Sequence, residues 1–328
     1  MEIDWEPFRK IVESNQRFVL SSHVRPDADA IGSELGMLGM LEQLGKDVRI
    51  INPSALVSNR KFLDPNDRVR CLADSDVSDE DVLNTDVHIV LDTSAWGQLG
   101  QVGKLLKKSS AKKVVIDHHV SSDDLGAIEF KDSTSDSTGS LVFQLADVLE
   151  VSIVPEVATA LFCAIATDTG WFRFPSTSSR TLRTVADLID FGATPHLIYQ
   201  QLYEQSSLPR VQLTARVLER VAVECEGKLA HTFVKWSDFV ETKAHPSDTE
   251  DLVNECLKIA GTECAFIAVE LQNKQVKFSF RSRVMRNVAE IAEQFGGGGH
   301  KQASGALLNA PLSDARDKVL DTFREALK

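Results

Sequence analysis

Short apolar runs alternate with helical stretches in the first half of the chain, and this alternation restricts the fold more than any other feature. Strands are predicted at residues 17–22, 46–51, 87–91 and 113–116, and the first long helix is predicted at 31–44. Strands separated by helices pair in parallel, and the helices cover the faces of the sheet. The sequence therefore predicts an α/β fold that begins with a mostly parallel sheet flanked by helices.

The pattern changes in the second half of the chain. Residues 180–220 have helical periodicity that is interrupted at Pro195 and Pro209. Beyond them, strands are expected at 229–236, 265–271 and 275–283, and helices at 249–259, 287–295 and 312–327. We predict a first domain over residues 1–190, a helical linker over 191–214 and a smaller α/β domain over 215–328. The active site is expected in the cleft between the two domains.

The charge of the chain limits its partners. Among the 328 residues, 43% are hydrophobic and 26% are charged, and the net charge is −12. Such a field repels a long nucleic acid, so no long duplex is expected as a partner. Short phosphorylated ligands remain compatible, because a metal site can supply the missing positive charge.

Targeting signals are not evident in the sequence. The acidic start, residues 1–4, lacks the layout of a signal peptide, and the longest apolar stretch, 157–166, is too short to span a bilayer. The five cysteines are scattered without a C-x-x-C pair, which is typical of buried thiols in a reducing compartment. We expect a soluble, cytoplasmic protein with no membrane partner.

Polar residues gather where the predicted strands end. His23, Asp27 and Asp29 follow the first strand and open the helix after it, although Asp27 or Asp29 could instead only cap that helix. Asp92 ends another strand, and Asp117-His118-His119 ends the next. Since ligand sites of open α/β sheets lie at the carboxyl ends of the strands, we expect these side chains to converge.

Asp168, which follows a predicted helix, completes the set with five carboxylates and up to three imidazoles. Without a cation such a cluster would repel itself and raise its own pKa values. Carboxylate oxygens together with imidazole nitrogens suit Mn²⁺ better than Ca²⁺, and the lack of thiolates argues against structural zinc. We therefore predict two divalent ions, Mn²⁺ first, with Mg²⁺ or Co²⁺ as alternatives.

A basic strand and a glycine run stand out near the C-terminus. Alternation over 276–283 places three apolar residues on one face and the polar residues on the other, which is also typical of an ordinary half-buried strand. The glycines at 296–299 let the backbone approach a ligand, and their N–H groups can form an anion nest beside His300. The predicted phosphate-binding residues are Arg281, Arg283, Gly297, Gly298, Gly299 and His300.

Aromatic residues follow Asp168 closely, in Trp171-Phe172-Arg173-Phe174. They could stack on a base, but packing in the core is the favoured interpretation.

The polar motifs resemble those of a known family. The pattern H-x-x-x-D-x-D-x-x-G-S at 23–33, with D-T at 92–93, D-H-H at 117–119 and D-T-G at 168–170, resembles the DHH phosphoesterase family. G-G-G-G-H followed by A-S-G at 303–305 resembles the C-terminal domain that accompanies it. The compact nanoRNase and pAp-phosphatase group is the most similar, and the resemblance covers nearly the whole chain.

The resemblance implies roles for individual residues. His23, Asp27 and Asp92 would hold one metal, and a second metal would be held by Asp29, Asp92, His118 and Asp168. Asp117 would orient His118, and His119, His300 and Arg281 would act on the phosphate.

The implied activity is hydrolysis of short oligoribonucleotides, and of the bisphosphate pAp, to mononucleotides and phosphate. The alternatives are a linear or cyclic dinucleotide phosphodiesterase, a RecJ-type exonuclease and a nucleotide sensor without turnover. A homodimer is left open.

Overall fold

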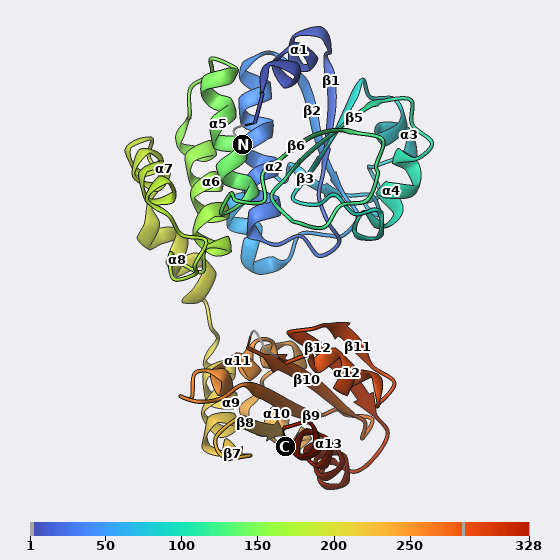
Figure 1. The fold of residues 1–328 in the computed structure, drawn as a ribbon, viewed down its shortest axis with the longest axis vertical. Helices are drawn as coiled ribbons and strands as arrows, with labels where there is room; N and C mark the ends of the chain where they lie inside the picture. Colours follow the sequence, from blue (N-terminus) through green and yellow to red (C-terminus); the bar gives the residue numbers. More distant parts are fainter. Residues whose placement is uncertain (1–2, 284–285, 328) are drawn as a thin grey trace. The chain divides into compact units, whose positions relative to one another are not determined.

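A wholly parallel six-stranded sheet forms the centre of the first compact unit, residues 1–205 (Figure 1). The structure is a computed structural model that describes residues 3–283 and 286–327. The strand order is β3-β2-β1-β4-β5-β6, which confirms the predicted parallel α/β sheet. The strands are β1 (Arg17–Ser21), β2 (Asp47–Asn52), β3 (Val69–Cys71), β4 (Val87–Leu91), β5 (Lys112–Asp117) and β6 (Ile128–Lys131).

Helices cover both faces of this sheet, so its strands are apolar on both sides. Phe18 and Leu20 of β1 pack in a cluster with α2, α5 and α6, whereas Val19 packs on the opposite face against α3 and α4. Both-sided burial is typical of parallel sheets and accounts for the uninterrupted apolar runs in the sequence. The helices are α1 (Glu6–Ser14), α2 (Ala28–Gln43), α3 (Asp79–Leu83), α4 (Gly100–Leu106), α5 (Thr138–Val148), α6 (Pro155–Asp168), α7 (Ser179–Asp190) and α8 (Pro195–Tyr203), with 3-10 turns η1 (Ser58–Leu63) and η2 (Trp96–Gln98).

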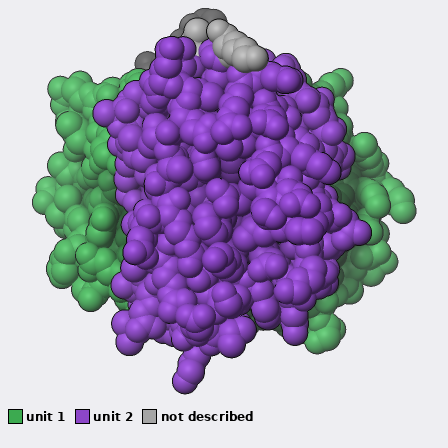
Figure 2. Space-filling view, turned by 90° about the horizontal axis from the view of Figure 1, so that it is seen from below, with its two compact units in different colours: residues 1–205 green, residues 206–328 purple. Residues whose placement is uncertain are grey.

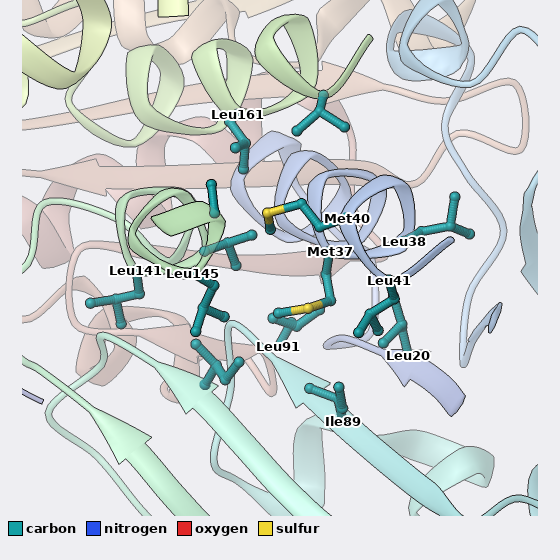
Figure 3. Close-up of a cluster of buried hydrophobic side chains, with 14 of the residues drawn as sticks. Leu20, Met37, Leu38, Met40, Leu41, Ile89, Leu91, Leu141, Leu145 and Leu161 are labelled. Carbon is teal, nitrogen blue, oxygen red and sulfur yellow. The ribbon is translucent and has the colours of Figure 1, made fainter. Parts of the chain in front are cut away.

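Helix α2 is buried between the sheet and α6. Figure 3 shows Met37 directed toward Leu91 of β4, while Met40 lies on the side of α6. Two glycines of α2 allow a close approach of the two helices: a Cβ atom at Gly32 would lie 2.3 Å from a carbonyl oxygen of α6, and one at Gly36 would lie 2.6 Å from a leucine side chain of α6. This contact fixes the start of α2 relative to the end of α6.

The second compact unit, residues 206–328, is coloured purple in Figure 2. It has its own mixed sheet and its own core. The order is β11-β12-β10-β9-β8-β7, and only the β8–β9 pair is parallel. Helices α12 and α13 pack on one face, and α9, α10 and α11 on the other. The strands are β7 (Ala222–Glu224), β8 (Leu229–Val234), β9 (Cys264–Glu270), β10 (Val276–Ser282), β11 (Gly298–His300) and β12 (Ala303–Leu308). The helices are α9 (Leu208–Glu219), α10 (Trp236–Thr242), α11 (Leu252–Leu257), α12 (Val288–Glu293) and α13 (Leu312–Ala326), with the 3-10 turn η3 (Pro246–Thr249).

Across the described residues, no helix combines the length and the apolar character needed to cross a membrane. The functional division predicted at residues 190 and 215 stays a prediction.

Candidate metal centre

The candidate site lies at the carboxyl edge of the parallel sheet in the first unit. The strand order changes direction between β1 and β4, where open α/β sheets place their ligands. His23 follows β1, Asp92 follows β4 and Asp117 ends β5, so three adjacent strands bring side chains to one place. Asp29 lies in the first turn of α2, and Asp168 is the last residue of α6.

The loop between β1 and α2 carries a helix cap that is also a candidate metal ligand. Asp27 Oδ1 accepts hydrogen bonds from the N–H groups of Asp29 and Ala30 at 3.0 and 3.1 Å, so the capping function is present. The same oxygen lies 3.8 Å from His23 Nε2, and Asp92 Oδ2 lies 3.5 Å from that nitrogen. The cap therefore fixes Asp27 without removing it from the cluster.

The N-terminus of α5 points at the buried carboxylate of Asp29. The N–H groups of Thr138 and Gly139 each donate to one of its oxygens at 2.8 Å, and Ser33 Oγ donates to Oδ1 at 3.3 Å. Unpaired N–H groups at a helix start favour negative charge. Asp29 is thereby held with Oδ2 3.7 Å from His118 Nε2.

Asp92 lies between two imidazoles. Its Oδ2 faces His23, whereas its Oδ1 lies 3.6 Å from His118 Nε2 and accepts a 2.9 Å hydrogen bond from Thr138 Oγ1. The residue is only 2% exposed, and its φ of 61° is left-handed, which is uncommon outside glycine. This backbone conformation ends the strand and presents the two oxygens to different neighbours.

The prediction that Asp117 orients His118 is wrong. Its Oδ1 lies 2.8 Å from His119 Nδ1 and accepts a bond from the His119 N–H at 3.0 Å, so it orients His119 and not His118. Its Oδ2 accepts a hydrogen bond from Ser94 Oγ at 2.7 Å and forms an ion pair with Lys131 Nζ at 3.2 Å. Nδ1 of His118 instead lies 3.4 Å from the carbonyl oxygen of Ser135.

The side chains assemble into groups suited to divalent cations. In each group the ligand atoms lie within 4.8 Å of one another, and the groups are His23, Asp27 and Asp92; Asp29, His118 and Asp168; and Asp92, His118 and His119. His118 Nε2 is 3.5 Å from Asp168 Oδ2. The structure thus brings together all six predicted ligands, and their oxygen and nitrogen donors fit a borderline divalent metal.

The electrostatics of the cluster indicate missing positive charge. Burial raises the pKa of Asp92 well above its usual range, and repulsion from Asp29 raises it further. Burial likewise raises the pKa of Asp168 to about 7, with Asp29 and Asp27 adding to the effect. Burial lowers the pKa of His23, but hydrogen bonding to Asp27 and Asp92 outweighs it and raises the value to about 11. A bound cation would remove this conflict, since it favours the ionised carboxylates and the neutral imidazoles.

The predicted phosphate-binding residues of the second unit lie on one side of its sheet. The register pairs Arg281 of β10 with Ala303 of β12, and Ala303 with His300 of β11, so Arg281 and His300 share a face with only a methyl group between them. Arg281 is half-buried, and His300 is exposed. The predicted alternation of β10 is confirmed, because Val276, Phe278 and Phe280 are buried.

The glycine run is not the free loop that its composition suggests. Gly298 and Gly299 belong to β11, where they pair with β12. A Cβ atom at Gly297 would lie 2.1 Å from the carbonyl oxygen of Gly305, so the close approach of this segment to β12 requires glycine. Arg283 is exposed, and its guanidinium donates to the carbonyl oxygen of Leu257.

Several residues that support the site were missed from the sequence. Thr138 and Gly139 bind the carboxylates of Asp29 and Asp92, while Ser94 and Lys131 bind Asp117. The small polar residues at 137–140 are an N-terminal helix signal that could have located the start of α5, but nothing in that signal names the carboxylate it faces.

Comparison with known proteins agrees with this architecture. A parallel sheet with a carboxylate–imidazole cluster at its carboxyl edge, followed by a second α/β unit, is an arrangement suited to metal-dependent hydrolysis. The chain belongs to the DHH family: residues 17–165 match the DHH family N-terminal domain, and residues 226–328 match the DHHA1 domain. The predicted family is therefore confirmed. Family membership and the donor groups together imply dependence on a divalent metal.

Two curated relatives and one solved structure resemble the chain over nearly its whole length. A Thermus thermophilus protein named bifunctional oligoribonuclease and PAP phosphatase NrnA is 30% identical over 98% of this chain and 95% of its own. A Bacillus subtilis protein of the same name is 27% identical, with 92% of each chain covered. The crystal structure of an exopolyphosphatase-related protein from Bacteroides fragilis has a TM-score of 0.87 at 26% identity, covering 98% of this chain and 96% of that chain.

Proposed function

We propose that this protein hydrolyses phosphate esters of short nucleotides with two divalent ions, Mn²⁺ before Mg²⁺ or Co²⁺. The observation that carries the proposal is that Asp92 lies between two donor groups, one with His23 and one with His118. The relatives named oligoribonuclease and PAP phosphatase support short oligoribonucleotides and pAp as substrates. The proposed location is the cytoplasm, in keeping with five free cysteines.

The residues around the metals would have different roles in the reaction. When bound, the ions lower the pKa of coordinated water and neutralise charge on the phosphate. Asp117 holds Nδ1 of His119, which leaves the opposite ring nitrogen to face a non-bridging phosphate oxygen. The α5 N-terminus and Thr138 keep Asp29 and Asp92 oriented, so that the site is ordered before the substrate arrives.

The second unit would bind the part of the nucleotide that the metals do not hold. Arg281 and His300 share one face of the sheet, and Ala303 between them leaves room for a phosphate. Arg283 and the backbone of Gly297, Gly298 and Gly299 would complete this phosphate site. A site of this size suits substrates with a few phosphates rather than a long strand.

A substrate panel tests the proposal. The panel contains pAp, di- and trinucleotides, long RNA and a cyclic dinucleotide, each assayed with Mn²⁺, with Ca²⁺ and after chelation. We expect hydrolysis of pAp and short RNA with Mn²⁺, little with Ca²⁺, and none after chelation. A preference for the cyclic dinucleotide would support the dinucleotide phosphodiesterase alternative, and a preference for long RNA would support an exonuclease of the RecJ type. Full turnover in verified metal-free protein would exclude metal catalysis.

The role of the second unit is tested by Arg281→Ala and His300→Ala, with Lys277→Ala as the control on the same face of β10. Each of the two substitutions should lower kcat/KM on pAp by roughly 10- to 100-fold, since a charge-assisted hydrogen bond contributes about 1.5–3 kcal/mol. Metal content and Tm should stay unchanged, and Lys277→Ala should behave like the wild type. Loss of metal from either variant, or unaltered kinetics in both, would remove these residues from phosphate binding.

A further inference from the structure

The turn that follows Asp168 has an unusual backbone. Helix α6 ends at Asp168, and then Gly170, Trp171 and Phe172 have φ values of 57°, 56° and 64°. The left-handed region is unfavourable for bulky side chains, and two such aromatic residues in succession are costly. Backbone strain of this kind persists where the surroundings enforce it, and it gathers at functional sites.

The aromatic side chains of this turn differ in their exposure. Trp171 and Phe172 pack inward, with their ring centroids 6.1 and 6.2 Å from that of Phe162, and Trp171 also contacts Tyr199 at 4.9 Å. The prediction of core packing is confirmed for these two residues. Phe174 differs, because 50% of it is exposed.

Phe174 is held in place although it is exposed. Its N–H donates to the carbonyl oxygen of Thr169 at 3.0 Å, and its ring lies directly on Gly170, where a Cβ atom would come within 2.5–2.7 Å of three ring atoms. Arg173 fixes the same turn, since its Nε donates to the carbonyl oxygen of Gly170 at 2.7 Å. One side of the ring thus lies against backbone, the Arg173 guanidinium lies 6.0 Å from the ring centroid, and half of the residue's surface is exposed.

The ring contacts a glycine that is close in sequence to a candidate metal ligand. Gly170 is two residues from Asp168, whose carboxylate oxygen is 3.5 Å from His118 Nε2. A nucleotide whose phosphate binds there carries a base with an apolar π face, which stacks on an aromatic side chain whatever its sequence. We infer that Phe174 is the base-stacking residue of the substrate site. The inference rests on the proposed function and adds to it a contact that recognises nucleosides without selecting among bases.

The test compares two substrates that differ only in the base. One is pAp, and the other is its base-free analogue, 1,4-anhydroribitol 3,5-bisphosphate, which keeps the hydroxyl that corresponds to the 2′-OH. Phe174→Ala should raise KM for pAp by roughly 5- to 100-fold with little change in kcat, because a stacking contact is made before and during the reaction. On the base-free substrate the change should stay below about twofold. Phe174→Trp should retain wild-type KM, and Phe174→Leu should not.

Phe191→Ala is the matched control, because Phe191 is another exposed phenylalanine of the first unit, 43% exposed. A second readout is independent of turnover: binding of a 2-aminopurine bisphosphate should quench its fluorescence in the wild type and not in Phe174→Ala. Equal losses on both substrates, full activity of Phe174→Leu, or unchanged quenching in Phe174→Ala would overturn the inference. If the wild type hydrolyses neither substrate, the proposed function fails, and the quenching still decides whether Phe174 stacks on a base.

Discussion

Asp92 combines a left-handed backbone with a buried carboxylate that faces two imidazoles. Few side chains tolerate both conditions, and asparagine is the one that keeps the shape while it loses the charge. Its amide oxygen can still accept the hydrogen bond of Thr138 Oγ1. Asp92→Asn therefore removes the charge of this residue while its packing and its hydrogen bond with Thr138 can be kept.

Asp92→Asn should lower kcat/KM by at least about 100-fold, because the two donor groups that contain Asp92 each lose an anionic ligand. In metal-free protein at neutral pH the Tm of the variant should rise by a few degrees, because a buried acidic group that is repelled by Asp29 is removed. Each kcal/mol of stability corresponds to about 2–4 °C in Tm. Kinetics and thermal melts with a chelator measure the two effects. Asp47→Asn, at the exposed start of β2, is the control that should change neither. Activity near that of the wild type would show that Asp92 is not a shared ligand.

At the scale of elements, the contact between α2 and α6 determines the distance between two candidate metal ligands, Asp29 and Asp168. Asp29 is three residues before Gly32, and Asp168 is four residues after Ala164, whose Cβ would lie 2.9 Å from a Cβ at Gly32. Any added volume at Gly32 must separate the helices that carry these two carboxylates. Packing and metal affinity are therefore coupled here.

Gly32→Ala should destabilise the first unit by about 1–3 kcal/mol, as overpacking does, and should weaken metal binding. Gly97→Ala is the control, since a Cβ atom there meets nothing within 4 Å. Urea unfolding and metal titration by calorimetry measure the two quantities. Weaker metal binding without loss of stability, or the reverse, would contradict the coupling.

Glu34 of α2 makes the stability of the folded protein depend on pH. Its Oε2 accepts a 2.8 Å hydrogen bond from Asn52, and Oε1 has no partner in the described chain. Burial raises the pKa of Glu34 from 4.5 to about 7, against the smaller lowering effects of Asn52 and Ser22. Between these values the folded protein holds a proton that the unfolded chain has released. Stability therefore falls as pH rises from 4.5 to 7, and levels off above.

Glu34→Gln should abolish this contribution, which amounts to about 3 kcal/mol between pH 4.5 and 8. The measurement is the difference in unfolding free energy between the two pH values, for wild type and variant, with a chelator present. Glu42→Gln on the same helix is the control and should leave the difference unchanged. An equal pH dependence in wild type and Glu34→Gln would show that Glu34 does not titrate in this range.

What the sequence predicts depends on whether the signal is local. Strands β1, β2, β4 and β5 follow from apolar runs, and the candidate ligands His23, Asp92 and His118 follow from their position just after such runs, whereas β3 and β6 were not predicted. The contact between Asp29 and the start of α5 does not follow from the sequence, because Asp29 and Thr138 are 109 residues apart. The partner of Asp117 depends on how the chain turns after β5, and composition does not encode that. Strand β11 contradicts the low strand propensity of glycine, since close contact with β12 overrides it.

At the scale of the whole molecule, the two units have separate cores, and all six candidate ligands belong to the first. A ligand that binds only the folded state stabilises the unit that binds it, by about 2.7 kcal/mol at 100 times its dissociation constant. Mn²⁺ should therefore slow hydrogen exchange in β1 and β4, and leave β9 and β10 unchanged. Mass spectrometry with and without a chelator resolves these strands. Equal protection in all four strands would show that the units unfold together.

The left-handed backbone at Asp92 also has an evolutionary consequence. Most replacements at this position would disturb the turn, whereas asparagine fits it, and a single base change converts an aspartate codon into an asparagine codon. A duplicated gene thus lies one mutation away from a protein that would keep this fold and the proposed nucleotide site but release its ligand unaltered.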